Sequence, residues 1–464
     1  MNTFLRKVRQ LAQDFVNWLW GTFFPPAVKP WCAIFYFVAQ DVGITTPTSE
    51  AGDIDDKLLQ ALTALKQSQF DHSQLHVVYR AVWRSARHPE TTVVGPLLPL
   101  PSSDYPNYNP PAGAFVDLGQ DLPHFLEWVY KWCPAKHYAV FFWGHSCGPA
   151  GLFKPAVGVK IPPPLSLDTL KTAFETFQAQ RSRGTRTAPG TAASPGMHAT
   201  LPAGPPGTQK AADVIAQLSA ASPKVEIALF QDCWMSTVET AYQLKDVVQY
   251  AIASQSLLPI GLGHPQFKWP YQKMLADLFS PDFDKDLLAD VAQVYGTASL
   301  AGIGSALTSV PVSLLDLSAV DGLSVPLGNL VTSLSTRTKD ARASAFAPAN
   351  IIDFNPPLST TLSTGDAGLI DLVMLCKSLN GDADPQVRQA AAALLVAVGH
   401  VVRGLDERGP KHFGYGGLSV LYYPKTRPLR DQFILGVILR SFYEGLPFQT
   451  AFTPSKRWPA LEHL

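Results

Sequence analysis

A cysteine and a histidine each follow an apolar stretch that predicts a buried strand. Cys233 comes shortly after the apolar residues 225–230, and His145 comes shortly after residues 138–143. Such runs are typical of central strands in a parallel sheet, which are buried on both faces. Because the carboxyl ends of parallel strands meet at one edge of a sheet, we expect the thiol and the imidazole to come together there. A thiol with an imidazole partner can act as an activated nucleophile.

The residues after Cys233 predict the start of a helix. Ser236 and Glu239 have the spacing of a capping box, in which a serine oxygen and a carboxylate satisfy free N–H groups of the first turn. The N-terminal end of a helix favours a nearby thiolate. A buried structural cysteine is the alternative that the local sequence leaves open.

The cysteines show no sign of a disulfide framework or a zinc site. Their number is odd, and no Cys-x-x-Cys pair occurs. The five cysteines are Cys32, Cys133, Cys147, Cys233 and Cys376. This usage is typical of a reducing compartment, so the sequence predicts a cytoplasmic protein.

The composition predicts a globular protein with no attraction for nucleic acid. Hydrophobic residues make up 46% of the 464 residues, which is ample material for a core. Lysine plus arginine and aspartate plus glutamate both number 37, so no overall positive charge draws a polyanion. No stretch is apolar for long enough to predict a membrane span. Residues 1–26 predict an amphipathic helix that docks on its own protein, on a protein partner or on a membrane surface.

Strand and helix patterns alternate over the first part of the chain. Residues 31–38 and 75–83 predict two more buried strands, and residues 55–66 and 117–132 have helical spacing. Together with the strands before His145 and Cys233, they predict an α/β fold with a mainly parallel sheet. The proline-rich residues 84–111 predict a long loop without regular structure.

The remaining stretches predict a linker and a mainly helical C-terminal part. Residues 178–210 are rich in Arg, Ser, Thr, Ala, Gly and Pro, which predicts a disordered linker between the histidine and cysteine strands. Beyond about residue 281 most patterns are helical. The stretches concerned are 317–334, 369–379, 387–405 and 431–443, with one strand predicted at 417–423.

These signals, taken in order, resemble the clostripain-like cysteine peptidases, which are related to caspases, metacaspases and gingipains. Members carry a Trp-x-His segment after one strand and a Phe-Asp-Ala-Cys-x-Met segment, with a later glutamate, after another. The matching residues here are Phe142 to His145, Phe230 to Met235, and Glu239. Further matches are residues 241–246, 253–254, 316–320, 369–372 and 417–420.

The resemblance implies a caspase-like three-layer α/β/α sandwich with a mainly parallel sheet and a largely helical C-terminal extension. The catalytic domain would span residues 27–280, and residues 281–464 would complete the fold. His145 and Cys233 would form the catalytic dyad of a cysteine endopeptidase acting on proteins or peptides. Backbone N–H groups of Ser146 and Cys233 would hold the oxyanion.

The chain departs from the family pattern at three places. One is the acidic residue often found shortly after the family's Ala-Ser, where Ser256 and Leu257 stand here, and the other two lie beside His145 and Cys233. Ser146 replaces the glycine that usually follows the histidine, and Gln231 replaces the aspartate two before the cysteine. In the family that aspartate receives a basic P1 side chain, so we expect a less strictly basic preference here. Gln231, Asp232 and Ser254 are the residues expected to line the P1 pocket.

No metal or cofactor site is predicted from the residues. Family members can need calcium, so calcium is implied by the resemblance alone. The acidic residues Asp53, Asp55 and Asp56 are more simply interpreted as the start of a helix.

In the family, the connection between the two catalytic strands is a place of self-cleavage. Here the linker 178–210 contains Arg181, Arg183 and Arg186, which are the candidate processing sites. Because both strands end at the site, we expect the two ends of the linker to lie near the cleft. A passive linker is the alternative.

Two other functions remain open on the sequence. A catalytically weak or inactive relative, serving as a scaffold or regulator, fits the substitutions at Ser146 and Gln231. A nucleotide-binding module is disfavoured, because no glycine-rich phosphate loop follows the first strand.

Overall fold

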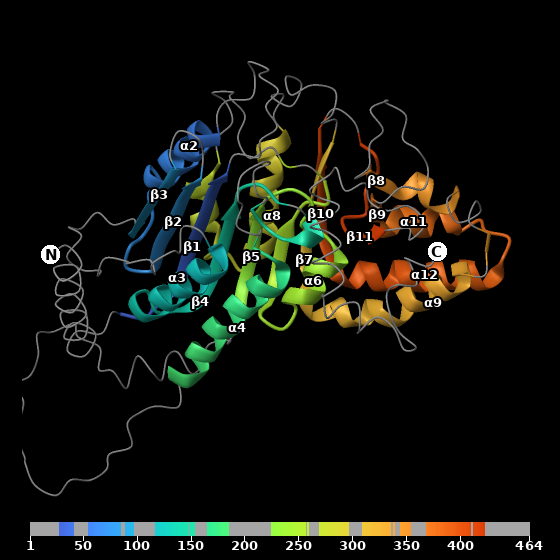
Figure 1. Ribbon diagram of the computed structural model, residues 1–464, viewed down its shortest axis with the longest axis horizontal. Coiled ribbons are helices and arrows are strands. Elements are labelled where there is room, and N and C mark those ends of the chain that lie inside the picture. Colours follow the sequence, from blue (N-terminus) through green and yellow to red (C-terminus); the bar gives the residue numbers. More distant parts are fainter. Residues whose placement is uncertain are drawn as a thin grey trace, which may run out of the picture.

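Eight strands form the central sheet, in the spatial order β10-β7-β6-β5-β4-β1-β2-β3 (Figure 1). They are β1 (Lys29–Gln40), β2 (Leu75–Arg84), β3 (Pro89–Pro96), β4 (Ala135–Trp143), β5 (Val225–Gln231), β6 (Val248–Ala253), β7 (Val310–Asp316) and β10 (Val402–Arg408). The structure, a computed structural model, describes residues 27–40, 54–84, 89–96, 117–146, 148–153, 165–184, 224–256, 258, 269–296, 309–335, 337–338, 344–353, 368–409 and 412–422.

The middle of the sheet is parallel. Strands β2, β1, β4, β5 and β6 pair in parallel, whereas β3 and β7 join antiparallel at the flanks and β10 pairs antiparallel with β7. Every residue of β5 is buried, as expected for a strand covered on both faces. The prediction of a mainly parallel sheet is confirmed.

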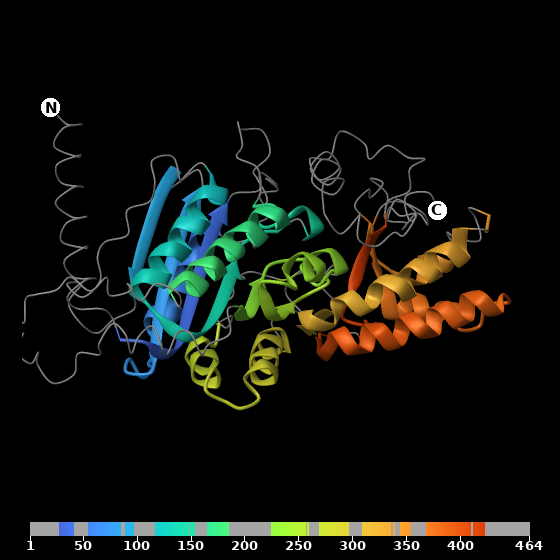
Figure 2. The same ribbon diagram turned by 90° about the horizontal axis from the view of Figure 1, so that it is seen from below.

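Helices cover both faces of the sheet and complete a three-layer sandwich (Figure 2). One face carries α3 (Leu118–Trp132), α4 (Leu167–Gly184) and α6 (Val238–Leu244). The other face carries α2 (Ile54–Lys66), α7 (Tyr271–Asp277) and α8 (Phe283–Gly296). A short 3-10 helix, η1 (Gly148–Ala150), follows the histidine strand.

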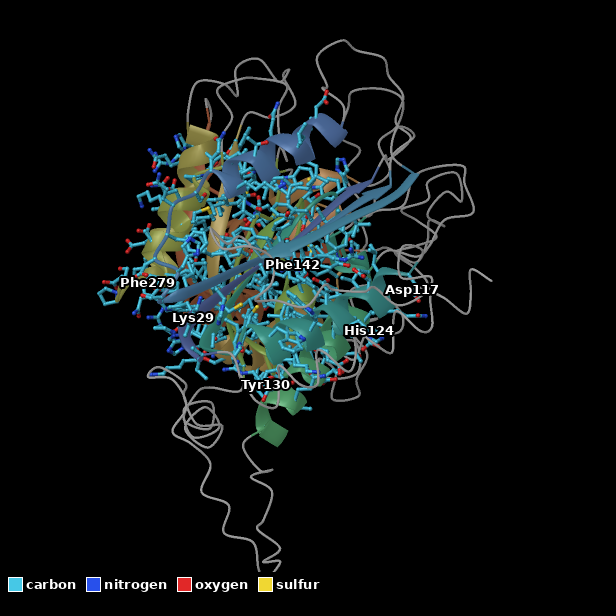
Figure 3. The ribbon with its side chains drawn as sticks, turned by 90° about the vertical axis from the view of Figure 1, so that its left-hand side faces the viewer. Lys29, Asp117, His124, Tyr130, Phe142 and Phe279 are labelled. Atoms are coloured by element: carbon cyan, nitrogen blue, oxygen red, sulfur yellow. The ribbon has the colours of Figure 1, made fainter. Side chains whose placement is uncertain are left out.

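Aromatic side chains fill the space between the sheet and its helices. Phe142 of β4 stacks on Phe230 of β5 with ring centroids 5.4 Å apart, and Phe35 stacks on Phe141 at 4.4 Å on the opposite face. In Figure 3, Phe142 lies in the middle of the molecule, between the two helical layers. The stack between Phe142 and Phe230 packs together the two strands that precede His145 and Cys233.

A buried ion pair fixes α3 to the sheet. The guanidinium of Arg80 on β2 donates to both carboxylate oxygens of Asp121, at 2.9 and 2.6 Å, and the hydroxyl of Tyr36 donates to the same carboxylate at 2.7 Å. All three residues are fully buried. The tyrosine adds a third hydrogen bond to the carboxylate, which offsets part of the cost of burying the two charges.

The C-terminal part adds helices and a second, three-stranded sheet in the order β11-β9-β8 (Figure 1). Its elements are η3 (Leu317–Leu323), α9 (Ser324–Ser335), η4 (Ala347–Ala349), β8 (Asn350–Asp353), β9 (Gly368–Asp371), α11 (Leu372–Leu379), α12 (Pro385–Val401) and β11 (Ser419–Tyr422). α12 starts at Pro385, whose ring suits the first helical position, with Asp384 as the N-cap. No helix of the described residues is long and apolar enough to span a membrane.

The C-terminal part contains more strands than the sequence patterns predict. The helix predicted to reach residue 405 ends at Val401, where the chain enters β10 directly.

The N-terminal half also contains a strand that was not predicted. Strand β3 lies inside the proline-rich stretch predicted to lack regular structure, and it pairs with β2 along the flank of the sheet. The helices predicted at 1–26 and 431–443 lie outside the described residues.

Candidate active site

Strands β4 and β5 bring the histidine and cysteine segments to the same edge of the sheet. The parallel pair is in register, with Trp143 opposite Gln231 at its carboxyl end. His145 lies two residues after Trp143, and Cys233 lies two residues after Gln231. The two segments therefore leave neighbouring strands at the same level, as the sequence predicts.

A side-chain hydrogen bond joins these segments directly. The hydroxyl of Ser146 donates to the backbone carbonyl of Cys233, and Ser146 is buried. Its backbone also forms an isolated bridge with Leu152, which in turn pairs with Leu165 before α4. The serine that replaces the usual glycine thus fixes the position of the cysteine loop.

The thiol of Cys233 is nearly covered and contacts one backbone position. Its side chain points to the face of the sheet that α7 and α8 cover, and the residue is 7% exposed. The N–H of Leu258 donates to the Cys233 sulfur at 3.3 Å, and the sulfur lies 3.5 Å from the Leu258 carbonyl oxygen. His145, by comparison, is partly exposed.

The residue after the cysteine adopts an unusual backbone conformation. Trp234 has a φ of 56°, in the left-handed region that a bulky residue rarely adopts. Gly148 packs closely against Trp234, so that a Cβ at Gly148 would lie 3.1 Å from the Trp234 carbonyl oxygen. Backbone strain of this kind is concentrated at functional sites.

Helix α6 starts one residue later than predicted. The N-cap is Thr237, whose hydroxyl accepts from the Thr240 N–H, because the Ser236 hydroxyl donates instead to the Gly417 carbonyl oxygen at 2.5 Å. The carboxylate of Glu239 accepts from Leu421 N–H at 2.9 Å. The expected capping box is therefore wrong, since both of its side chains bind the C-terminal part instead.

Gln231 and Asp232 are fully buried beside Cys233. The Tyr271 hydroxyl of α7 donates to the Gln231 carbonyl oxygen at 3.1 Å, while the Gln231 amide nitrogen has no partner among the described residues. Burial raises the pKa of Asp232 well above its usual value, and the Gly144 N–H offsets this rise in part. A neutral Asp232 is therefore favoured in this arrangement.

Ser254 lies at the end of β6, behind the residues that follow Cys233. Its carbonyl accepts from the Ser236 N–H at 2.9 Å, and its hydroxyl accepts from the Ser256 N–H at 3.1 Å. Ser254 is fully buried. Both of these bonds hold the backbone next to the cysteine in place.

The candidate processing sites do not lie where the sequence places them. Helix α4 continues to Gly184, so the linker cannot begin at residue 178. Arg181 is buried and donates to the carbonyls of Lys224 at 2.8 Å and Lys136 at 3.0 Å. Arg183 is on the same helix, and Arg186 lies outside the described residues.

The contacts of Arg181 also correct the expected course of the linker. Lys136 and Lys224 lie at the amino ends of β4 and β5, whereas His145 and Cys233 follow the carboxyl ends. The end of α4, at the lower edge of Figure 1, is therefore separated from the site by the length of a strand, about 20 Å. The end of α4 and Lys224, the described residues on either side of the linker, thus lie at the amino edge of the sheet, away from the cleft. This follows because a chain must return to the amino edge to enter a parallel strand.

Several residues near the site were not predicted from the sequence. Leu258 contacts the cysteine through backbone atoms, which residue type does not reveal. Tyr271 and Gln255 are marked by no local pattern, and Asp371, although it lies within the matched residues 369–372, was not predicted to act near the site. Cys147, the other thiol close to His145 in the sequence, lies outside the described residues. In the described part of the chain, no three His, Cys, Asp or Glu side chains are grouped as metal ligands.

Comparisons with known proteins bear on this arrangement. Residues 210–398, which include Cys233, match the model of the clostripain family, Peptidase_C11. A search of curated proteins gives no match. The fold is similar to that of a secreted C11 cysteine protease from Bacteroides thetaiotaomicron in complex with an irreversible peptide inhibitor. That similarity has 14% identity and a TM-score of 0.51, over 90% of this chain and 99% of that chain.

A second solved structure is an inactive zymogen C11 protease from Parabacteroides distasonis, at 16% identity and a TM-score of 0.48, over 91% of this chain and 98% of that chain. The similarity to the secreted protease shows the fold, a caspase-like α/β/α sandwich. Residues 210–398, less than half of the chain, are similar in sequence to the clostripain family. The resemblance drawn from the sequence is confirmed.

Proposed function

We propose that the protein is a cysteine endopeptidase in which Cys233 is the nucleophile and His145 its acid–base partner. The observation that carries this proposal is the junction of the two strand ends, where the Ser146 side chain binds the Cys233 carbonyl. The parallel register of β4 and β5 supports it, because the two segments leave the sheet at the same level. The family match over residues 210–398 makes peptide bonds the natural substrate class.

The proposed reaction has two halves. The Cys233 sulfur, as thiolate, attacks the peptide carbonyl carbon and forms a tetrahedral oxyanion, which the backbone N–H groups of Ser146 and Cys233 stabilise. His145 donates a proton to the amine as the carbon–nitrogen bond breaks, which leaves a thioester on Cys233. A water molecule, deprotonated by His145, then hydrolyses the thioester and releases the acid product.

The proposed P1 pocket involves Gln231, Asp232 and Ser254, which lie at the carboxyl ends of β5 and β6. A carboxamide at Gln231 and a neutral Asp232 would give an arginine or lysine side chain no full counter-charge. We therefore propose a P1 preference that is less strictly basic than the family's. The hydrogen bond from the Tyr271 hydroxyl to the Gln231 side-chain oxygen supports this, because that oxygen already has a donor and is less available to a basic P1 side chain.

An electrophilic peptide probe that alkylates active-site thiols tests the proposed nucleophile. Wild-type protein should be labelled on Cys233, and labelling should be lost in Cys233→Ala and reduced in His145→Ala. Peptide mapping by mass spectrometry identifies the modified residue. Labelling of Cys147 in place of Cys233 would reject the assignment.

We also propose that the linker is nicked by the protein itself, at the last turn of α4 or beyond it. Arg183 and Arg186 remain the candidates, since Arg181 is buried by its contacts with the strands. Intact-mass analysis of wild type beside Cys233→Ala tests this, with two associated fragments expected only for wild type. A fully active chain that is never cut contradicts the proposal, as does equal nicking of the variant.

A catalytically weak or inactive relative is the second candidate. The observation that favours it is the coverage of Cys233, a residue that is 7% exposed and whose thiol is bound by the Leu258 backbone. In that case the electrophilic probe should leave Cys233 unlabelled, and linker cleavage by another protease should not restore labelling.

A further inference from the structure

The segment after β6 holds the backbone that follows the proposed nucleophile. The carbonyls of Ser254 and Ser256 accept from the N–H groups of Ser236 and Trp234, at 2.9 and 3.0 Å. Two residues beyond Ser256, Leu258 supplies the N–H that reaches the thiol. The position of the cysteine loop therefore depends on the position of this short segment.

One side chain of this segment is anchored in the C-terminal part of the chain. Gln255 is fully buried, and its amide nitrogen donates to the Asp371 carboxylate at 2.6 Å. The two residues are 116 positions apart in the sequence. Among the described contacts, this is the bond that ties the segment after β6 to the second sheet.

Asp371 is itself held from several sides. It ends β9 and caps α11, where its carboxylate accepts from the Met374 N–H at 2.8 Å. It also accepts from the Gly416 N–H at 2.6 Å, and a Cβ at Gly416 would meet the side chains of Val373 and Asp371. A carboxylate fixed by three donors is a rigid anchor, because moving it would break several buried hydrogen bonds at once.

We propose that Gln255 and Asp371 are positioning residues for Cys233, a role that rests on the proposed function. Through the Gln255 side chain, the second sheet sets the place of residues 254–256 and, with them, of Leu258. These residues in turn direct the Leu258 N–H at the Cys233 sulfur and, through the Ser256 carbonyl, hold the backbone of Trp234 next to Cys233. Neither residue touches the reacting atoms.

A matched pair elsewhere in the fold separates positioning from stability. Gln243 on α6 is also buried, and its amide nitrogen donates to the Asp168 carboxylate at 3.3 Å. No described hydrogen bond links Gln243 to the segment 254–258. Gln255→Met and Gln243→Met each remove the hydrogen bond of one buried glutamine to an aspartate while keeping the side-chain volume.

The test is the rate of Cys233 alkylation by iodoacetamide as a function of pH, read by mass spectrometry of the Cys233 peptide. A weakened Leu258 contact removes a donor from the thiolate, so the midpoint of the profile in Gln255→Met should rise by about half a pH unit or more. Asp371→Asn should shift it in the same direction, because its amide nitrogen would face that of Gln255. The double variant should shift it no further than the larger single change.

The profile of Gln243→Met should match wild type even where its melting temperature falls. An unshifted midpoint in both Gln255→Met and Asp371→Asn overturns the proposal, and so does an equal shift in Gln243→Met. This readout does not need peptidase activity. A wild type that cleaves no peptide therefore speaks against the proposed function alone, whereas an active enzyme with unshifted variants speaks against the positioning role alone.

Discussion

The Ser146 hydroxyl donates a hydrogen bond to the carbonyl of Cys233, so the segments that follow β4 and β5 are joined at the carboxyl edge of the sheet. The glycine that usually follows the family's histidine could not make this bond. At this position the serine has less backbone freedom than glycine, but its side chain links the segment that follows the histidine strand to the segment that contains Cys233.

Ser146→Ala should slow peptide hydrolysis more than it destabilises the fold. Losing one buried hydrogen bond lets the cysteine loop shift, which predicts a fall in kcat of about three- to tenfold. The matched control is Ser166→Ala, which removes a serine whose hydroxyl accepts from the Thr169 N–H at the start of α4. That variant should lose about 1 kcal/mol of stability with kcat unchanged. Equal kcat values for both variants would contradict the role of Ser146.

Gln231→Asp should strengthen the preference for arginine and lysine at P1. A carboxylate in this buried place would pair with a basic side chain, which predicts a rise of about tenfold or more in kcat/KM relative to neutral P1 residues. A peptide library profiled with wild type, Gln231→Asp and Tyr271→Phe measures this. Wild-type cleavage restricted to arginine and lysine would show that another residue supplies the charge.

Arg181→Ala should destabilise the junction between α4 and the sheet. The guanidinium donates to two backbone carbonyls and lies over the Tyr138 ring at 4.6 Å, so its loss should cost about 2–4 kcal/mol. The control is Arg403→Ala, whose exposed pair with Asp316 at 3.9 Å should contribute less than about 1 kcal/mol. Urea unfolding measures both, and similar losses would mean that Arg181 is no anchor.

The pair Asp277 and Asp290 should make stability depend on pH. Burial raises the pKa of Asp290 to about 6, while Lys273, 2.6 Å from each carboxylate, opposes that rise. A carboxyl group whose pKa is raised on folding contributes stability that is complete below about pH 4 and is lost as the pH rises through 6. Asp290→Asn should therefore abolish a loss of about 2 kcal/mol between pH 4 and 7. Parallel unfolding curves for wild type and variant across this range would be the contrary result.

The strand ends were predictable because their signal is local. Apolar runs before His145 and Cys233 are long enough to identify buried strands, and parallel topology then brings their ends together. β10 was not predictable in the same way. Its residues Val402–Arg408 are mainly polar and follow α12 without a turn, and their strand conformation depends on pairing with β7.

The supporting contacts of the site escaped prediction for a similar reason. Gln255 and Asp371 are ordinary polar residues far apart in the sequence, and only the packed fold pairs them. The capping box at Ser236 and Glu239 failed because the two side chains bind the backbone of Gly417, just before β11, and of Leu421, within it. Arg181 was predicted to lie in a disordered linker because of the composition around it. Local composition does not reveal that its guanidinium binds carbonyls at the amino ends of two strands.

The identity of the nucleophile is the central claim, and hydrolysis of one peptide substrate by four proteins tests it most directly. Wild type, Cys233→Ala, His145→Ala and Cys147→Ala are compared at equal concentration, with folding checked by circular dichroism. The account predicts that Cys233→Ala abolishes hydrolysis, that His145→Ala reduces it severely, and that Cys147→Ala retains most of it. Full activity in Cys233→Ala, or equal loss from Cys147→Ala and Cys233→Ala, would contradict it.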